Sequence, residues 1–202
     1  MKLVFVHGWA SGAFVWDALK PHFTAYDCHF VNLGFIGEEK INIPDGKFIG
    51  IGHSLGGLWL LKHYPEQMTG FVSIASFSCF HQHIGQNVLS KMQKNLAKDT
   101  AAQIQYFWHH AGLDHPKGFI DLNPLKLVEG LQWLSTWETN IPSNLPTKIL
   151  ACRNDQIVPE DMSIKLWKNA SIEWIDKGGH ILPLTQADWC KKHIKEFISD
   201  VK

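Results

Sequence analysis

Short apolar runs bounded by turn-forming residues recur along the chain, and about six of them have the length of β-strands. These runs lie at Leu3–Val6, Cys28–Leu33, Phe48–Gly52, Phe71–Ala75, Lys148–Cys152 and Ile172–Ile175. Segments compatible with helices separate most of the runs, at about Ala13–His22, Leu55–His63, Glu160–Lys168 and Asp188–Ser199. Strands alternating with helices predict an α/β fold, with a mostly parallel sheet of about six strands flanked by helices.

The alternation stops between residues 77 and 140, where helical periodicity continues without a convincing strand. Apolar faces recur there at Val88, Leu89, Met92 and Leu96, at Ile104, Phe107, Trp108 and Ala111, and at Leu125, Val128, Leu131 and Leu134. We therefore predict a single domain over residues 1–202. Its core is residues 1–76 and 141–202, and a helical lid is inserted at about 77–140.

Composition and charge exclude several classes of protein. The 202 residues carry 19 Lys and Arg against 19 Asp and Glu, so the chain lacks the basic surface that nucleic-acid binding needs. No apolar run approaches the roughly 18 residues of a membrane span. The four cysteines form no CxxC pair, and the first apolar run ends in His-Gly rather than in a signal-peptide pattern. We expect a monomeric cytoplasmic protein with no membrane partner.

A nucleophile motif follows the third apolar run. Residues 52–57 read Gly-His-Ser-Leu-Gly-Gly and precede a predicted helix, which is the context that a G-x-S-x-G elbow requires. Small residues at positions 52 and 56 let the strand and the helix approach each other, so that Ser54 projects its hydroxyl from a tight turn. Glycine-rich turns of this kind also bind phosphate, so the motif alone leaves that alternative open.

A serine nucleophile needs a base and a carboxylate that orients the base. Asp155 follows the predicted strand that ends at Cys152, and His180 lies just past the strand that ends at Ile175. Each of them alone could be an ordinary loop or turn residue. The order Ser, Asp, His at the carboxyl ends of strands predicts a catalytic triad of Ser54, Asp155 and His180.

Acyl transfer also needs donors for the oxyanion. The loop His7-Gly8-Trp9 follows the first strand, and we expect the backbone N–H of Trp9 to act together with that of Leu55. The Trp9 side chain is then free to line an acyl pocket, although a core aromatic is the alternative.

Other polar clusters are less informative. His81, His83, His109, His110 and His115 could bind metal, but no carboxylate or cysteine spacing completes a site, so we predict neither a metal nor a cofactor. Lys91, Lys94 and Lys98 fall on one predicted helical face, which is either solvated or a docking surface for an acidic partner. The role of Arg153, the only arginine, stays open between a substrate anchor and a surface residue.

Together these motifs resemble the α/β-hydrolase superfamily, and more narrowly the pimeloyl-[acyl-carrier protein] methyl ester esterases of biotin synthesis. The narrower resemblance lies in the following pieces: His7-Gly8-Trp9 with Val15-Trp16, residues 52–58, residues 71–76 with Cys79-Phe80, and Gly130-Leu131-Gln132 leading toward Leu145-Pro146. The serine motif is common to hydrolases, whereas the Ala-Ser-x-x-Cys-Phe stretch and the His-Gly-Trp loop are much less so.

The resemblance implies an esterase that frees the methyl-masked end of a pimeloyl chain held on an acyl-carrier protein. It implies that Trp9, Ser54, Leu55 and His180 contact substrate, and that a lid segment lines the acyl channel. That segment comprises Phe107, Trp108, His109, His110 and Ala111. It also implies an acidic carrier protein as partner, for which Lys91, Lys94 and Lys98 are the docking candidates.

The sequence departs from the family in two places. Family members carry arginines just ahead of the position of Phe107, whereas this chain has Ala102 and Tyr106 there, and lysine does not replace a bidentate guanidinium. The segment Gly34–Gly37 is followed after about ten residues by the nucleophile strand, which leaves no room for a helix that most relatives have. A general esterase for short or medium acyl chains, and a non-catalytic small-molecule sensor on this fold, are the alternatives.

Overall fold

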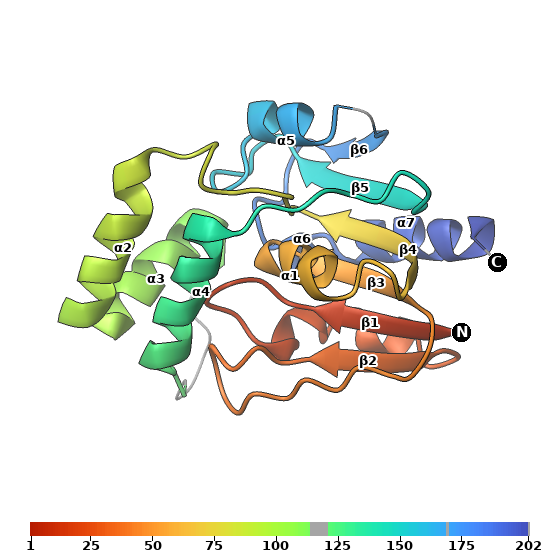
Figure 1. Cartoon of the computed structure of the whole chain (residues 1–202), viewed down its shortest axis with the longest axis horizontal. Coiled ribbons are helices and arrows are strands. Elements are labelled where there is room, and N and C mark those ends of the chain that lie inside the picture. The colour runs from red at the N-terminus through yellow and green to blue at the C-terminus, as the bar shows by residue number, and fades with distance from the viewer. Residues whose placement is uncertain (114–120, 169, 202) are drawn as a thin grey trace.

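The computed structural model describes residues 1–113, 121–168 and 170–201, and it is built around one parallel sheet (Figure 1). Six strands pair in the order β2-β1-β3-β4-β5-β6, and every pairing is parallel. The strands are β1 (Lys2–Val6), β2 (Asp27–Val31), β3 (Phe48–His53), β4 (Met68–Ile74), β5 (Thr147–Cys152) and β6 (Ile172–Ile175). The predicted sheet is confirmed.

Side chains of the strands alternate between two buried clusters, one on each face of the sheet. In β1, Val4 and Val6 belong to one cluster, and Leu3 and Phe5 belong to the other. Because both faces are covered, the inner strands β1 and β3 are buried at consecutive positions, as in other buried parallel sheets.

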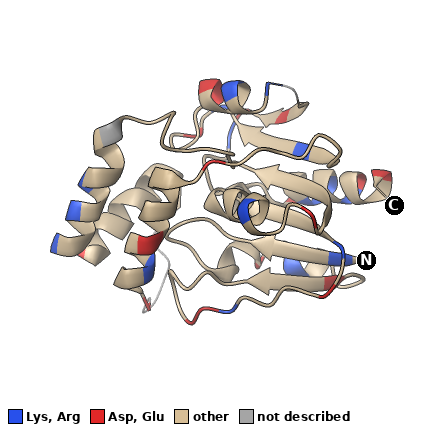
Figure 2. Ribbon diagram, viewed as in Figure 1, with Lys and Arg blue, Asp and Glu red and all other residues tan. Residues whose placement is uncertain are grey.

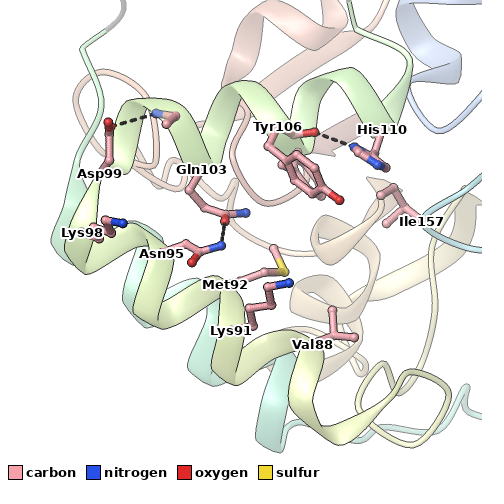
Figure 3. Close-up of a pocket in the computed structure, with 12 residues that line it drawn as sticks. Val88, Lys91, Met92, Asn95, Lys98, Asp99, Gln103, Tyr106, His110 and Ile157 are labelled. Atoms are coloured by element: carbon pink, nitrogen blue, oxygen red, sulfur yellow. Dashed lines mark hydrogen bonds between the residues drawn. The ribbon is translucent and has the colours of Figure 1, made fainter.

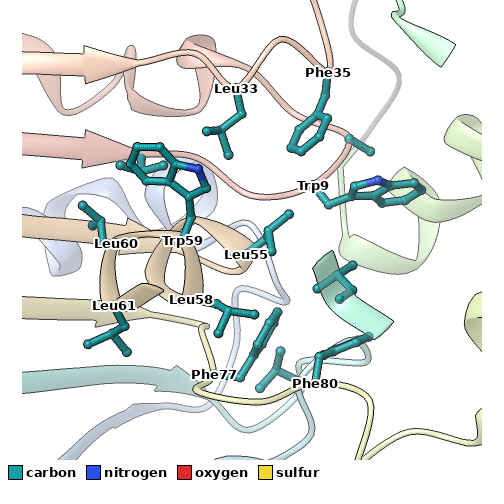
Figure 4. Packing of buried hydrophobic residues seen from close by; sticks show 14 of the residues in the cluster. Trp9, Leu33, Phe35, Leu55, Leu58, Trp59, Leu60, Leu61, Phe77 and Phe80 are labelled. Carbon is teal, nitrogen blue, oxygen red and sulfur yellow. The ribbon is translucent and has the colours of Figure 1, made fainter. Parts of the chain in front are cut away.

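Helices cover both faces of the sheet. Buried residues of α1 (Leu55–His63) and α5 (Glu160–Leu166) belong to the first cluster, which Figure 4 shows around α1. Residues of the 3-10 helix η1 (Ala13–Trp16), of α6 (Leu182–Thr185) and of α7 (Ala187–Asp200) belong to the second cluster. The predicted helix at Leu55–His63 has the same bounds in the structure, and the predicted C-terminal helix is longer by one residue at each end.

The expectation of one helix over Ala13–His22 is wrong. The structure forms two short 3-10 helices there, η1 and η2 (Lys20–His22), with Pro21 in the second. Proline lacks an N–H and crowds the preceding turn, so an α-helix does not continue through it. Residues 32–47 contain no helix either, in agreement with the short spacing ahead of the nucleophile strand.

The segment between β4 and β5 forms a helical insertion, which consists of α2 (Gln86–Lys98), α3 (Thr100–Ala111) and α4 (Pro124–Thr136). It lies beyond the carboxyl ends of the strands (Figure 1). Asp99 caps α3 by accepting a 2.9 Å hydrogen bond from the Ala102 N–H. In α4 the buried face contains Leu127, Leu131 and Leu134, whereas Leu125 is 84% exposed and does not belong to it.

None of the helices in the described part of the chain is both long and apolar enough to cross a membrane.

Candidate active site

Ser54 occupies the sharp turn between β3 and α1. Its backbone has φ 53° and ψ −127°, a strained conformation for a residue with a side chain. A Cβ at Gly52 would lie 2.3 Å from Cα of Gly57, and one at Gly56 would lie 2.1 Å from the carbonyl oxygen of Val6. Only glycine fits at these two positions, so the glycines of the motif permit the turn that presents Ser54.

Neighbouring groups hold this backbone in place. The N–H of Ser54 donates to the carbonyl of Ile74 at 3.0 Å. The carbonyl of Ser54 accepts from the N–H of Gly57 at 3.0 Å and from Oγ of Ser76 at 2.5 Å. Because each backbone polar group is bonded, the strained conformation is fixed by its surroundings.

Ser54, His180 and Asp155 form a hydrogen-bonded chain. The Ser54 hydroxyl lies 2.9 Å from Nε2 of His180, and Nδ1 of His180 lies 2.8 Å from Oδ2 of Asp155. All three residues are at most 5% exposed. Three loops at the carboxyl ends of β3, β5 and β6 thus bring together the side chains that the sequence singled out.

The carboxylate of Asp155 is held from both sides. Its Oδ1 accepts from the backbone N–H groups of Ile157 at 2.8 Å and Val158 at 2.9 Å. Its Oδ2 is thereby left for His180, which fixes the tautomer with a proton on Nδ1 and a lone pair on Nε2 toward Ser54. The arrangement suits a base that removes the serine proton.

A second histidine, which sequence reasoning did not select, supports the first. Nε2 of His53 donates to the backbone carbonyl of His180 at 2.9 Å, and the two rings lie 5.1 Å apart. Burial and the neighbouring His180 lower the pKa of His53 to about 3, so this imidazole stays neutral. Its position directly before Ser54, inside the serine motif, is the feature of the sequence that could have identified it.

The loop that carries His180 is packed against the end of α3. The N–H of His180 donates to the carbonyl of Ala111 at 3.1 Å, and Oδ1 of Asn154 accepts from the N–H of Gly179 at 2.9 Å. Gly179 has φ 65°, and a Cβ there would lie 3.3 Å from the Ala111 oxygen. The helical insertion therefore contributes directly to the placement of His180.

The His7-Gly8-Trp9 loop lies against Ser54. A Cβ on Gly8 would be 2.7 Å from Cβ of Ser54 and 3.2 Å from its Oγ, so glycine allows the backbone to come this close. His7 is fully buried, with Nε2 3.0 Å from the N–H of Leu33, and burial lowers its pKa to about 4. Among the described residues, no acceptor pairs with the N–H of Trp9 or of Leu55.

Two tryptophans tie this loop to the helical insertion. Nε1 of Trp9 donates to the carbonyl of Leu127 in α4 at 2.8 Å, and Nε1 of Trp108 in α3 donates to the carbonyl of Ala10 at 2.7 Å. Trp9 also meets Phe107 edge to face, with ring centroids 4.8 Å apart. Through its bond to Ala10, Trp108, for which the resemblance implied a place in the acyl channel, anchors α3 to the loop.

An apolar cavity of about 320 Å³ opens beside Ser54. Of the residues predicted to contact substrate, Trp9, Ser54 and Phe107 line it. Sequence reasoning missed the other walls, which are Phe77, Phe80, Ile84, Gly85, Val88, Met92, Leu134, Gln156 and Ile157. Phe77 and Phe80 follow β4 closely, just as Ser54, Asp155 and His180 follow their strands, and this position could have pointed to them.

A larger groove of about 720 Å³ lies between α2 and α3 (Figure 3). It shares Val88, Met92, Phe107 and Ile157 with the cavity at Ser54, so the two spaces adjoin. His110 lines the groove, whereas His109 and Ala111 line neither space, because His109 is exposed to solvent and Ala111 is buried beneath the His180 loop.

Lys91, Lys94 and Lys98 are all exposed on α2. Figure 2 shows basic positions, in blue, along this helix. Lys91 and Lys98 line the groove, and Lys94 does not. Arg153 lies away from both spaces: it pairs with Glu160 and with Asp176 at 3.4 Å and stacks on Trp174, so its surroundings are those of a surface residue.

Comparisons with known proteins find matches by sequence and by structure. Residues 3–192 match the model of the Alpha/beta hydrolase family. A pimeloyl-[acyl-carrier protein] methyl ester esterase of Shewanella woodyi is 32% identical over 52% of this chain and 50% of the relative. The enzyme of the same name from Serratia marcescens is 26% identical over 98% of this chain and 93% of the relative.

Solved structures show the same fold at low sequence identity. An esterase from Exiguobacterium antarcticum superposes with a TM-score of 0.80 at 13% identity, covering 98% of this chain and 92% of that one. A bromoperoxidase from Bacillus anthracis has a TM-score of 0.80 at 16% identity, over 98% and 91% of the two chains. Because these two proteins carry different names, the likeness establishes the fold alone.

Proposed function

The chain belongs to the alpha/beta hydrolase family, and from this premise we propose that it is a serine carboxylesterase acting on the methyl ester of a pimeloyl chain held on an acyl-carrier protein. The observation that carries the proposal is the hydrogen-bonded chain Ser54–His180–Asp155 at the wall of an apolar cavity. Its products are pimeloyl-[acyl-carrier protein] and methanol.

In the first half of the reaction Ser54 is acylated. His180 Nε2 takes the hydroxyl proton while Ser54 Oγ attacks the ester carbonyl, and Asp155 stabilises the imidazolium that forms. The tetrahedral intermediate collapses when His180 returns the proton to the methoxy oxygen. Methanol leaves, and the acyl chain stays on Ser54 as an ester.

In the second half water releases the acid. His180 removes a proton from a water molecule, the hydroxide attacks the acyl-enzyme, and Ser54 leaves with the proton from His180. The N–H groups of Trp9 and Leu55 are the candidate oxyanion donors in both halves, and losing one such donor costs about 3 kcal/mol of transition-state stabilisation. Every proton transfer is supplied by these side chains and water, so the reaction needs no cofactor.

The two adjoining spaces give the substrate a path. Apolar side chains line the cavity at Ser54, which suits a methylene chain, and the groove between α2 and α3 continues from it toward Lys91 and Lys98. We place the methyl ester at Ser54 and the carrier end of the chain in the groove. In this reading α2, α3 and α4 are the lid.

Carrier docking rests on charge. Lys91, Lys94 and Lys98 lie exposed on α2 beside the outer end of that path, and an acidic carrier would be steered toward them. The four cysteines are unpaired in the structure, which agrees with a reducing compartment, and we place the protein in the cytoplasm.

Complementation tests the substrate most plainly. The gene is expressed in a biotin-requiring strain that lacks its own pimeloyl-carrier methyl esterase, with Ser54→Ala in parallel. Wild type restores growth without biotin and Ser54→Ala does not, if the proposal holds.

Purified protein separates the alternatives. Turnover of short model esters without rescue of growth would favour a general short- or medium-chain esterase with the same triad. Absence of turnover on carrier-bound and free esters alike would favour a non-catalytic sensor.

Charge reversal tests carrier docking on its own. Lys91→Glu, Lys94→Glu and Lys98→Glu together should lower kcat/KM for the carrier-bound ester about tenfold, and spare a small free ester, because steering acts on the charged partner. The matched control reverses three exposed lysines elsewhere, Lys62, Lys168 and Lys192. Equal losses on both esters, or in both triple variants, would refute docking at α2.

A further inference from the structure

The two connections that join the helical insertion to the sheet lie side by side. Cys79, on the segment leaving β4, forms a β-bridge with Glu138, on the segment returning to β5. Next to this bridge, the N–H of Thr139 donates to the carbonyl of Ser78 at 2.9 Å. The entry and exit of the insertion are therefore held together by backbone hydrogen bonds.

Three side chains of types that can ligate a metal meet at this bridge. One ligand atom each from Cys79, His81 and Glu138 lies within 4.8 Å of the other two. The thiol sulfur of Cys79 is 3.6 Å from Nδ1 of His81. Cys79 is buried, His81 is half-buried and Glu138 is exposed, so the group sits at the surface with one side open to water.

The spacing is close to that of donors sharing one ion. In a tetrahedral site zinc binds sulfur at about 2.3 Å, and nitrogen and carboxylate oxygen at about 2.0–2.2 Å, so its ligand atoms lie roughly 3.3–3.6 Å apart. The 3.6 Å between the Cys79 sulfur and Nδ1 of His81 already meets this spacing. The pairs that include Glu138 lie within 4.8 Å, so its carboxylate needs to approach by at most about 1.5 Å. His81 and Glu138 can supply that movement because neither is fully buried.

The donor set selects the metal. A thiolate, an imidazole and a carboxylate suit a borderline-soft cation such as Zn²⁺, rather than Mg²⁺ or Ca²⁺, which prefer oxygen alone. The thiolate and the carboxylate together balance the two charges of the ion. Gln82 already orients the carboxylate, since its Nε2 donates to Glu138 Oε2 at 2.8 Å.

We propose that Cys79, His81 and Glu138 bind one Zn²⁺ ion, with water in the fourth position, and that the ion fastens the entry of the helical insertion to its exit. Sequence reasoning predicted no metal site because Glu138 is far from the other two residues along the chain. The short Cys-x-His spacing was the only local signal. The site contains none of Ser54, Asp155 and His180, so metal binding can be tested independently of the proposed esterase activity.

Cobalt provides a direct probe, because it replaces zinc and its bond to a thiolate gives an intense near-ultraviolet band. Co²⁺ is titrated into reduced, tag-free, metal-free protein. We expect the band and the visible bands of four-coordinate cobalt to saturate at one ion per chain, and one equivalent of Zn²⁺ to displace them. Zn²⁺ should also raise the unfolding temperature.

Variants locate the site. Cys79→Ser should abolish the thiolate band, and Glu138→Gln, an exposed change that does not threaten folding, should weaken cobalt binding at least about tenfold and remove the stabilisation by Zn²⁺. The controls are Cys28→Ser, which removes a thiol elsewhere, and His83→Gln, which removes a neighbouring imidazole; both should bind as wild type does. A missing band in wild type, a band that survives Cys79→Ser, or equal binding by Glu138→Gln would overturn the site.

Discussion

At the scale of single residues, the orientation of His180 depends on Asp155. Its carboxylate accepts from two backbone amides and from His180. In Asp155→Asn the side-chain amide can satisfy the two backbone donors only with its oxygen, which turns its NH₂ group toward His180 and favours the wrong tautomer. We expect kcat for a small ester to fall about 10⁴-fold with little change in unfolding temperature. A fall of less than tenfold in steady-state assays would show that Asp155 does not orient the base.

His53 should act through His180 and not on the substrate. Its Nε2 donates a hydrogen bond to the backbone carbonyl of His180. The substitution His53→Leu leaves this buried carbonyl without its donor. We expect kcat to fall about tenfold with KM nearly unchanged, because the loss misplaces the base without altering the cavity.

His53→Gln is the matched variant, since its amide nitrogen can reach the position of Nε2, and it should recover most of the rate. Equal losses in the Leu and Gln variants would mean that shape, and not this hydrogen bond, is what matters at position 53.

At the scale of elements, the end of α3 and the His180 loop form one unit through the Ala111 carbonyl. Gly179→Ala introduces a Cβ 3.3 Å from that oxygen at φ 65°. We expect a loss of about 1–2 kcal/mol in the free energy of unfolding and at least a tenfold fall in kcat, because the base moves with the loop.

Gly46→Ala is the control for backbone strain alone. Gly46 has φ 77° and open space around its Cβ position, in the connection between β2 and β3. In urea unfolding the Gly46→Ala variant should lose about as much stability as Gly179→Ala, whereas its kcat should match that of wild type. Comparable kcat losses in both variants would argue against a specific contact between α3 and the loop.

The elements were largely predictable because apolar periodicity is a local property. The strands, α1 and the three helices between residues 77 and 140 all follow their patterns. Leu125 was misassigned because steps of three residues drift by about 60° each around an α-helix, so Leu125 lies on the opposite side from Leu134 and Leu127 is buried instead. The contact of Ala111 with His180 could not be predicted, because it joins two backbone groups and does not depend on which side chains stand at these positions.

The meeting of Ser54, Asp155 and His180 was predictable for a different reason. The carboxyl ends of parallel strands share one edge of a sheet, so residues following β3, β5 and β6 must come near each other. The walls of the cavity come instead from a loop after β4, from α2 and from α4, and their meeting depends on how the helical insertion packs on the sheet.

At the scale of the whole molecule, buried neutral histidines should make stability fall in mild acid. Burial lowers the pKa of His7 to about 4 and that of His53 to about 3, whereas both titrate near 6.5 in the unfolded chain. As the pH falls below 6.5, His7 and His53 become protonated in the unfolded chain but stay neutral in the folded one. The free energy of unfolding therefore decreases. Between pH 6.5 and 5 we expect a loss of about 1.5 kcal/mol per histidine.

Urea unfolding at the two pH values measures this loss. His53→Gln should reduce it by one histidine's share, and His22→Gln, at an exposed position, should leave it unchanged. Identical losses in wild type and His53→Gln would show that His53 is not the buried titrating group.

The central claim is that Ser54 is the nucleophile of an esterase for a carrier-bound methyl ester. The most direct measurement is the initial rate of methanol release from pimeloyl-[acyl-carrier protein] methyl ester by purified wild type and Ser54→Ala. We predict stoichiometric release by wild type and a rate at least about 10³-fold lower in the variant. Release by Ser54→Ala at the wild-type rate, or no release by wild type, would contradict the claim.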